Sequence, residues 1–238
     1  MRPFRGYSVA NYPTRFRDST GHCSGNPDDP ENPDYGCWQK ADEVREKYGV
    51  DIDDPGSEYW TLGILSFVFN TLKRYVGLIG ETLWGEAFFG KTSMKIGGLP
   101  PGYLGQWDKG SVRIDPAVLR DANLTQEGMT GFLAHELTHG LVRYLEKKGE
   151  NPVEDYATFV GWGEVWTLPN WEVYRWKNPG TGPSNYARTT IFPEEDFCDS
   201  MREVAVNGYL TTNRAAWFTE FLSGRSTVPY TIHTGYRP

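Results

Sequence analysis

The amino-acid sequence predicts an α+β fold in one large domain. Apolar residues recur at helical spacing over residues 126–148, which indicates a long helix with one buried face. Strand-like segments at 93–96 and 111–115 flank a turn rich in Gly and Pro, as expected for a small sheet. A chain of 238 residues is also long enough to bury a substantial core without cross-links.

The first predicted feature is an irregular loop over residues 18–37, which is rich in Asp, Asn, Pro and Gly. Several oxygen-bearing side chains in this loop are candidate ligands for a structural Ca²⁺ ion, although EF-hand spacing is absent: Asn26, Asp28, Asp29, Glu31, Asn32 and Asp34. A solvated loop without calcium is the favoured interpretation, because such residues are common in turns. Cys23 and Cys37 flank the loop and could form a disulfide in an oxidising compartment. With His22 they could instead hold a second zinc ion, but no CxxC pair supports that alternative.

The next elements are two helices, expected at 38–48 and 60–75, and an apolar stretch at 82–89 that fits either helix or strand. The β-like pair at 93–96 and 111–115 then precedes the long helix. We assign residues 1–60 to an N-terminal extension packed on a main domain of residues 61–238.

Three more helices are predicted after the long one. Their expected spans are 152–160, 193–210 and 215–222, and Cys198 within the second should be a small buried thiol. The segment 161–174 carries three tryptophans, which are Trp162, Trp166 and Trp171. Filling or capping the core is the favoured role for them, with lining of a substrate site as the alternative.

Charge and hydropathy argue against two classes of function, nucleic-acid binding and insertion into a membrane. The formal net charge of −7 argues against a nucleic-acid interface, which needs clustered Lys and Arg. The N-terminus lacks the apolar core of a signal peptide, and no window is expected to reach the ~18 apolar residues of a membrane span. The sequence therefore predicts a soluble chain without membrane insertion, either cytoplasmic, exported by another route, or exported with a leader already removed.

One motif specifies a chemistry, His135-Glu136-Leu137-Thr138-His139. Residues four apart on a helix are offset by about 40° and about 6 Å, so both imidazoles project from one face and can hold one metal ion. Glu136 lies about 100° away, where it can polarise a metal-bound water without being a ligand itself. This is the pattern of a zinc hydrolase.

The surrounding sequence places this motif in the middle of a stable helix. Thr125 is a suitable N-cap, Gly149 a C-terminal stop, and Lys147 and Lys148 suit the negative end of the helix dipole. The expected buried stripe comprises Met129, Phe132, Leu133, Leu137, Leu141, Tyr144 and Leu145.

A catalytic zinc also needs a third protein ligand. Glu154 and Glu195 lie in similar segments, Pro-Val-Glu-Asp-Tyr and Pro-Glu-Glu-Asp-Phe. A helix that starts at residue 152 and runs antiparallel to the long helix reaches the level of His139 only near residue 160. Glu154 therefore lies before that level and Glu164 lies beyond it. Glu195, which follows a long connection, is free of this constraint and is the favoured ligand, with Glu164 as the runner-up.

The segment Glu195-Asp196-Phe197-Cys198-Asp199 follows the HELTH motif in the chain. It resembles the EDFAE-type helix of gluzincin zinc metallopeptidases, in particular the lethal-factor-like and Pro-Pro endopeptidase group. The resemblance covers residues 93–223 in the order of elements. It implies a zincin-like fold, in which a small mixed sheet lies over the HExxH helix and a second helix carries a glutamate ligand. It also implies that Glu195 binds zinc and that Asp199, one turn later, supports a ligand.

The match to this family has departures. Cys198 stands where a small Ala is usual, the segment 161–192 is long, and residues 1–60 match nothing in the pattern. The resemblance further places a Tyr shortly before the ligand glutamate. Tyr186 is therefore the candidate that stabilises the oxyanion, with Tyr209 and His233 as substitutes.

The reaction expected from the motif and the resemblance is zinc-dependent hydrolysis of a peptide bond by a zinc-bound water that Glu136 activates. Peptide or protein is then the substrate, and one Zn²⁺ is the cofactor. The strand around 112–114 is a candidate to bind an extended substrate at its edge, unless the chain's own loops cover it. The alternative from another class is a non-catalytic structural or binding module, such as a virion or toxin accessory protein, that kept zinc for folding. A glycan hydrolase is disfavoured because no suitable carboxylate pair is apparent.

Overall fold

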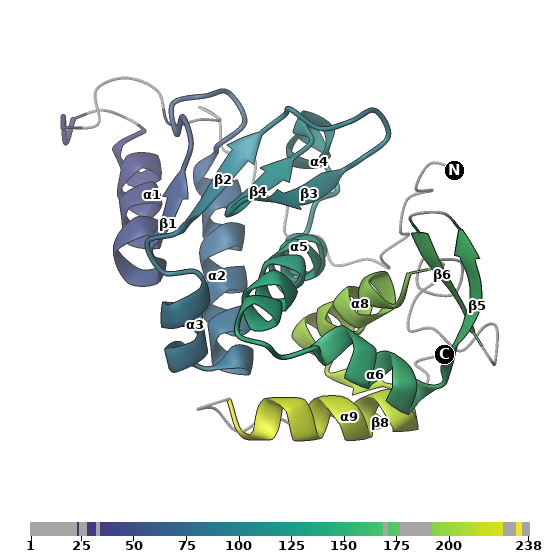
Figure 1. Ribbon diagram of the computed structural model, residues 1–238. Coiled ribbons are helices and arrows are strands. Elements are labelled where there is room, and N and C mark those ends of the chain that lie inside the picture. The colour runs from purple at the N-terminus through teal and green to yellow at the C-terminus, as the bar shows by residue number, and fades with distance from the viewer. Residues whose placement is uncertain are drawn as a thin grey trace. The chain divides into compact units, whose positions relative to one another are not determined.

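Within the residues that the computed structural model describes, the chain is an α+β protein, as predicted (Figure 1). These residues are Cys23, 28–31, 34–168, 171–176, 192–225 and 232–234. They contain eight helices, one mixed four-stranded sheet and two two-stranded pairs. The chain forms two compact units, and helices α2 and α5 each contribute residues to both. Unit 1 comprises Met1–Lys73 and Phe88–Leu133, and unit 2 comprises Arg74–Ala87 and Ala134–Pro238.

The sheet of unit 1 has the strand order β1-β2-β4-β3. Its strands are β1 (Val50–Ile52), β2 (Thr92–Ile96), β3 (Gly105–Asp108) and β4 (Ser111–Ile114). β1 pairs with β2 in parallel and β2 with β4 in parallel, whereas β3 and β4 are antiparallel. The predicted strands at 93–96 and 111–115 are thus confirmed, while β1 and β3 were not predicted.

The pairing of β4 overturns one expectation. Residues 112–114 form ladders with β2 on one side and β3 on the other, so their backbone groups have no open edge at which a peptide could add. The prediction that an extended substrate binds at the edge of this strand is therefore wrong.

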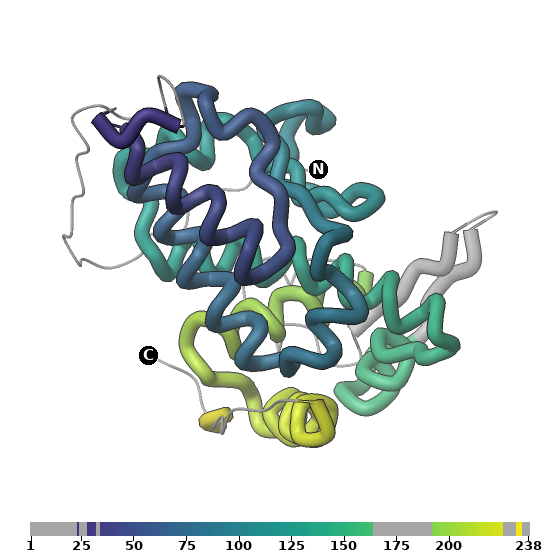
Figure 2. Tube along the Cα trace, turned by 90° about the vertical axis from the view of Figure 1, so that its left-hand side faces the viewer, coloured from purple at the N-terminus to yellow at the C-terminus, as the bar shows by residue number. Residues whose placement is uncertain are grey.

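Helix α1 (Tyr35–Tyr48) leads directly into the sheet, and the path can be followed in Figure 2. Gly49 ends the helix with a left-handed backbone, φ 64°, and β1 begins at the next residue. Residues 1–60, assigned to an extension, therefore supply a strand of the same sheet as β2. Cys23 and Cys37 form a disulfide, which rules out their use as ligands of a second zinc site. The short helix α4 (Pro116–Arg120) follows β4.

Helix α2 (Leu62–Ile79) corrects the expectation that no segment reaches the length of a membrane span. Its 18 residues have a mean hydropathy of 1.3, enough by length and composition to cross a membrane. Core helices of soluble proteins pass the same test, and 44% of this window is buried in the fold. Among the described residues it is the one such helix, which is compatible with a soluble protein.

Helix α5 (Gln126–Lys147) has the caps that its sequence predicted. The Gly128 N–H donates to Thr125 Oγ1 at 3.1 Å, as an N-cap requires. At the other end the Gly149 N–H donates to the Glu146 carbonyl and the Glu150 N–H to the Leu145 carbonyl, the two bonds of a Schellman motif. Met129, Leu133, Leu137, Leu141 and Leu145 of the predicted stripe are fully buried, whereas Phe132 and Tyr144 are half-buried.

Unit 2 contains the remaining elements. They are α3 (Glu81–Ala87), α6 (Pro152–Val160), the hairpin of β5 (Trp162–Leu168) and β6 (Trp171–Trp176), α8 (Pro193–Val206), β7 (Tyr209–Leu210), α9 (Thr212–Ser223) and β8 (His233–Thr234). α6 packs against both α8 and α9. Their contact is an aromatic cluster with ring centroids 4.8 to 6.2 Å apart, formed by Tyr156, Phe197, Trp217, Phe218 and Phe221. Cys198 is buried and free, as predicted.

Candidate metal centre

The two motif histidines face the same point from adjacent turns of α5. Their Nε2 atoms lie 3.3 Å apart, and the two side chains are 15% and 18% exposed. Leu137 and Leu141, on another face of the same turns, are fully buried and hold this part of the helix in the core. The helical spacing of His135 and His139 thus produces the convergent pair that the sequence suggested.

Helix α8 brings a carboxylate to this pair. Glu195 places Oε2 3.2 Å from His135 Nε2 and Oε1 3.7 Å from His139 Nε2. Donors about 2.0–2.2 Å from one tetrahedral zinc ion are about 3.3–3.6 Å from each other, so these separations are close to those expected around a single ion. Among the described residues, His135, His139 and Glu195 are the one group of three that could hold a metal.

The carboxylate of Glu136 is part of the same environment. Glu136, which directly follows His135, is 8% exposed. Burial lowers the pKa of His135, but hydrogen bonds to Asp199 and Glu195 and the negative charges of Asp199 and Glu136 outweigh this effect and raise the pKa to about 10. The negative surroundings of this imidazole therefore favour positive charge at the ring, carried either by a proton or by a metal ion that takes the place of the proton on Nε2.

Each candidate ligand histidine has a carboxylate at its other ring nitrogen. Asp199 Oδ1 lies 3.1 Å from His135 Nδ1, and Glu194 Oε1 lies 2.8 Å from His139 Nδ1. A carboxylate can only accept, so each contact favours the tautomer with hydrogen on Nδ1 and a lone pair on Nε2. The sequence had suggested a supporting role for Asp199, whereas the contact of Glu194 was missed.

Each of these two carboxylates also contacts the guanidinium group of an arginine. Arg143 Nη2 donates to both oxygens of Glu194, at 2.8 and 3.0 Å, and Arg202 Nη1 lies 3.2 Å from Asp199 Oδ1. Partial burial raises the pKa of Glu194, but the hydrogen bond to His139 and the charge of Arg143 outweigh this and lower it. Glu194 is thus ionised at neutral pH.

A second polar cluster begins one residue after the candidate ligand. Asp196 is fully buried and accepts hydrogen bonds from the Tyr156 hydroxyl at 2.9 Å, the Trp162 indole at 3.1 Å and Arg214 Nη2 at 3.0 Å. Ser200 Oγ lies 2.8 Å from the Tyr156 hydroxyl. Trp162 is 5% exposed, so its role is the predicted one of filling the core. The cluster joins α6, α8, α9 and the start of β5.

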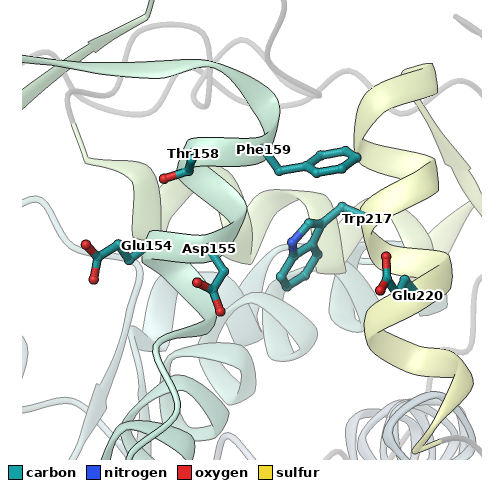
Figure 3. Close-up of a pocket in the computed structure, with 6 residues that line it drawn as sticks. All are labelled: Glu154, Asp155, Thr158, Phe159, Trp217 and Glu220. Carbon is teal, nitrogen blue, oxygen red and sulfur yellow. The ribbon is translucent and has the colours of Figure 1, made fainter.

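A pocket of about 430 Å³ lies between α6 and α9, and none of its lining residues belongs to the group of His135, His139 and Glu195. Its lining consists of Glu154, Asp155, Thr158, Phe159, Trp217 and Glu220 (Figure 3). No histidine or cysteine is among these residues. Glu154, the carboxylate in a segment like that of Glu195, therefore belongs to this pocket and not to the histidine pair.

The remaining sequence candidates fall outside the cluster or outside the described residues. Tyr186 lies in the part of the chain that the structure does not describe, and for Glu164 only the backbone is described. Tyr209 and His233 pair with each other on β7 and β8, with ring centroids 5.0 Å apart. Two of the six calcium candidates, Asn26 and Asn32, are not described, and the described ones form no metal-binding group.

Comparisons of the chain with protein-family models, with curated proteins and with solved structures found no match. A function for this chain is therefore inferred from the chemistry of His135, His139 and Glu195 and of the residues around them.

Proposed function

We propose that this protein is a zinc-dependent endopeptidase with a zincin-like fold. The observation that supports this most is the convergence of His135, His139 and Glu195, with donor atoms spaced for one tetrahedral ion. Two imidazoles and one carboxylate form the His₂Glu donor set of catalytic zinc sites, which leaves the fourth position for water or substrate.

The residues around the cluster have distinct roles in this proposal. A bound zinc ion would supply Lewis-acid activation of water and of the scissile carbonyl. Glu136 takes the proton from the attacking water and returns it to the leaving amine. Asp199 and Glu194 keep the two imidazoles in the ligating tautomer. Tyr186 remains the proposed donor to the oxyanion, with Tyr209 and His233 as the alternatives.

The alternative is a zinc-containing structural or binding module without catalysis. A structural site is closed by four protein ligands, so its fourth donor would have to come from outside the group of three. Retention of a buried carboxylate at Glu136 favours the enzyme, because a structural site has no use for a general base at that position.

The test combines metal analysis with digestion of a peptide library. We expect about one zinc per chain in the wild type, which His139→Ala should abolish. Glu195→Gln should lose zinc, whereas the matched variant Glu154→Gln, in the similar segment on α6, should keep it. Full zinc in His139→Ala, or loss of zinc only in Glu154→Gln, contradicts the assigned ligands.

Catalysis is tested separately with Glu136→Gln. This variant should fold and bind zinc but cleave peptides at least ~10² to 10⁴-fold more slowly, the usual contribution of a general base. Equal turnover by Glu136→Gln and wild type refutes the mechanism. Stoichiometric zinc without any peptide cleavage by the wild type supports the structural module instead.

A further inference from the structure

We propose that Arg143 and Glu194 form a clamp that fixes the ring of His139, so that both residues set the zinc affinity without touching the ion. The inference rests on the proposed zinc site. It adds two positioning residues, neither of which lies in the HExxH motif.

The clamp is defined by three contacts. Glu194 Oε1 lies 2.8 Å from His139 Nδ1, and Arg143 Nη2 donates to Oε1 at 3.0 Å and to Oε2 at 2.8 Å. Oε1 is therefore shared by the imidazole and the guanidinium. Because a carboxylate held from two directions has little rotational freedom, the ring that donates to it is held as well.

The position of these residues in sequence makes the clamp part of the metal centre. Arg143 follows His139 by four residues, so the two side chains project from the same face of α5. Glu194 directly precedes the proposed ligand Glu195 on α8. One short segment of α8 thus contacts the ring of His139 at Nδ1 through Glu194 and faces its Nε2 through Glu195.

An ordinary surface ion pair is the competing interpretation, and the exposure of the groups separates the two. Arg143 also pairs with Glu146 on the same helix at 2.9 Å, where the side chains are 52% and 39% exposed. The exposed ion pair between Arg143 and Glu146 is expected to contribute little to stability. Glu194 is only 22% exposed, and besides Arg143 it contacts the ring of His139, whose side chain is 18% exposed.

Charge and geometry predict opposite results for Arg143. Its guanidinium is positive, so removal makes the surroundings more negative, and on charge alone a divalent cation should then bind more tightly. If Arg143 instead acts by holding Glu194 and hence His139, removal should weaken binding. The sign of the change therefore distinguishes a positioning residue from a bystander.

The experiment measures zinc affinity of the full chain by competition with a chromophoric chelator. Glu194→Gln should bind zinc about 10 to 100-fold more weakly, the usual effect of removing a partner of a ligand histidine. Arg143→Gln should weaken binding about three to tenfold, and Arg143→Lys less, because an ammonium group keeps the charge and can still donate to Glu194, which Arg143 contacts through Nη2 alone. The control Glu146→Gln removes the other partner of Arg143 and should change the affinity by less than about twofold.

Two further measurements exclude misfolding as the cause. Near-UV circular dichroism and thermal unfolding of the zinc-free Arg143 variants should match the wild type, since Arg143 is half-exposed. In cobalt-loaded protein, the visible absorption bands of Arg143→Gln should shift relative to those of Glu146→Gln, because the ring of His139 is reoriented.

The outcomes separate this inference from the proposed function. Unchanged or tighter zinc binding in Arg143→Gln, or an equal loss in Glu146→Gln, overturns the clamp while the zinc site stands. A wild-type chain that binds no zinc overturns the zinc site and the clamp together.

Discussion

The buried ion pair between Arg214 and Asp196 offers the sharpest test of how unit 2 is held together. Arg214 is 2% exposed and Asp196 is fully buried, and the guanidinium donates to both carboxylate oxygens. Replacing Arg214 by Met keeps much of the side-chain volume but leaves a buried carboxylate with only the neutral donors Tyr156 and Trp162.

The loss of stability expected for Arg214→Met follows from the burial of the ion pair. Removing one partner of a buried ion pair typically lowers the free energy of unfolding by about 3–5 kcal/mol. At about 2–4 °C per kcal/mol for a chain of this size, the melting temperature should fall by roughly 6–20 °C. Replacing both partners, in Asp196→Asn with Arg214→Met, should recover part of the loss because no unpaired charge remains.

The chain contains a matched control for this substitution. Arg225 pairs with Glu150 at 2.7 Å, but the two side chains are 27% and 46% exposed. Arg225→Met should therefore cost no more than about 1 kcal/mol for the ion pair, with up to about another 1 kcal/mol for its contact with the ring of Phe221. Thermal and urea unfolding of the three variants measure these values. A loss in Arg214→Met no larger than that in Arg225→Met would refute the reasoning.

Two further predictions concern the backbone and the disulfide. Gly49→Ala should destabilise the protein by more than about 1 kcal/mol, because φ is +64° and the added Cβ would lie 2.4 Å from the Gly90 nitrogen. Gly85→Ala, in a helix with nothing within 4 Å, should instead be neutral or stabilise by up to about 1 kcal/mol, as urea unfolding can measure. Replacing Cys23 and Cys37 by Ser should lower the unfolding free energy by about 3 kcal/mol, since the bridge spans a sequence separation of 14. Reduction of the wild type should give the same shift in the unfolding midpoint.

The helices were predictable where their signals are local. α6 begins at Pro152 and ends before Gly161, as its proline and glycine indicate. The end of α8 was predicted at residue 210 but occurs at Val206. Gly208 explains the difference, because it has φ +69° and its N–H donates to the Glu203 carbonyl in a helix-ending turn.

The short strands were not predictable for a different reason. β3 consists of Gly, Gln, Trp and Asp, all half-buried, so it shows no alternation between buried and exposed residues. β1 has only three residues. What makes both segments strands is pairing with β4 and β2, and that information lies elsewhere in the chain.

The candidate metal site of His135, His139 and Glu195 also combines local information with information from distant parts of the chain. His135 and His139 converge because of helical spacing alone, so the sequence was sufficient. Glu194 to Asp196 are three consecutive acidic residues whose separate roles depend on neighbours from other elements. Glu194 contacts His139, Glu195 faces both histidines and Asp196 contacts Arg214.

Consecutive residues of a helix point about 100° apart, so one turn of α8 can serve three partners at once. The consequence is that the position of Glu195 at the histidines depends on both of its neighbours. Glu194 ties one side of the turn to α5, and Asp196 ties the other side to Tyr156 on α6 and Arg214 on α9. A change at Asp196 should therefore displace the carboxylate of Glu195 even though Asp196 has no contact with either histidine among its hydrogen bonds. We therefore expect substitutions at Asp196 to lower both the stability of the fold and the zinc affinity of the proposed site.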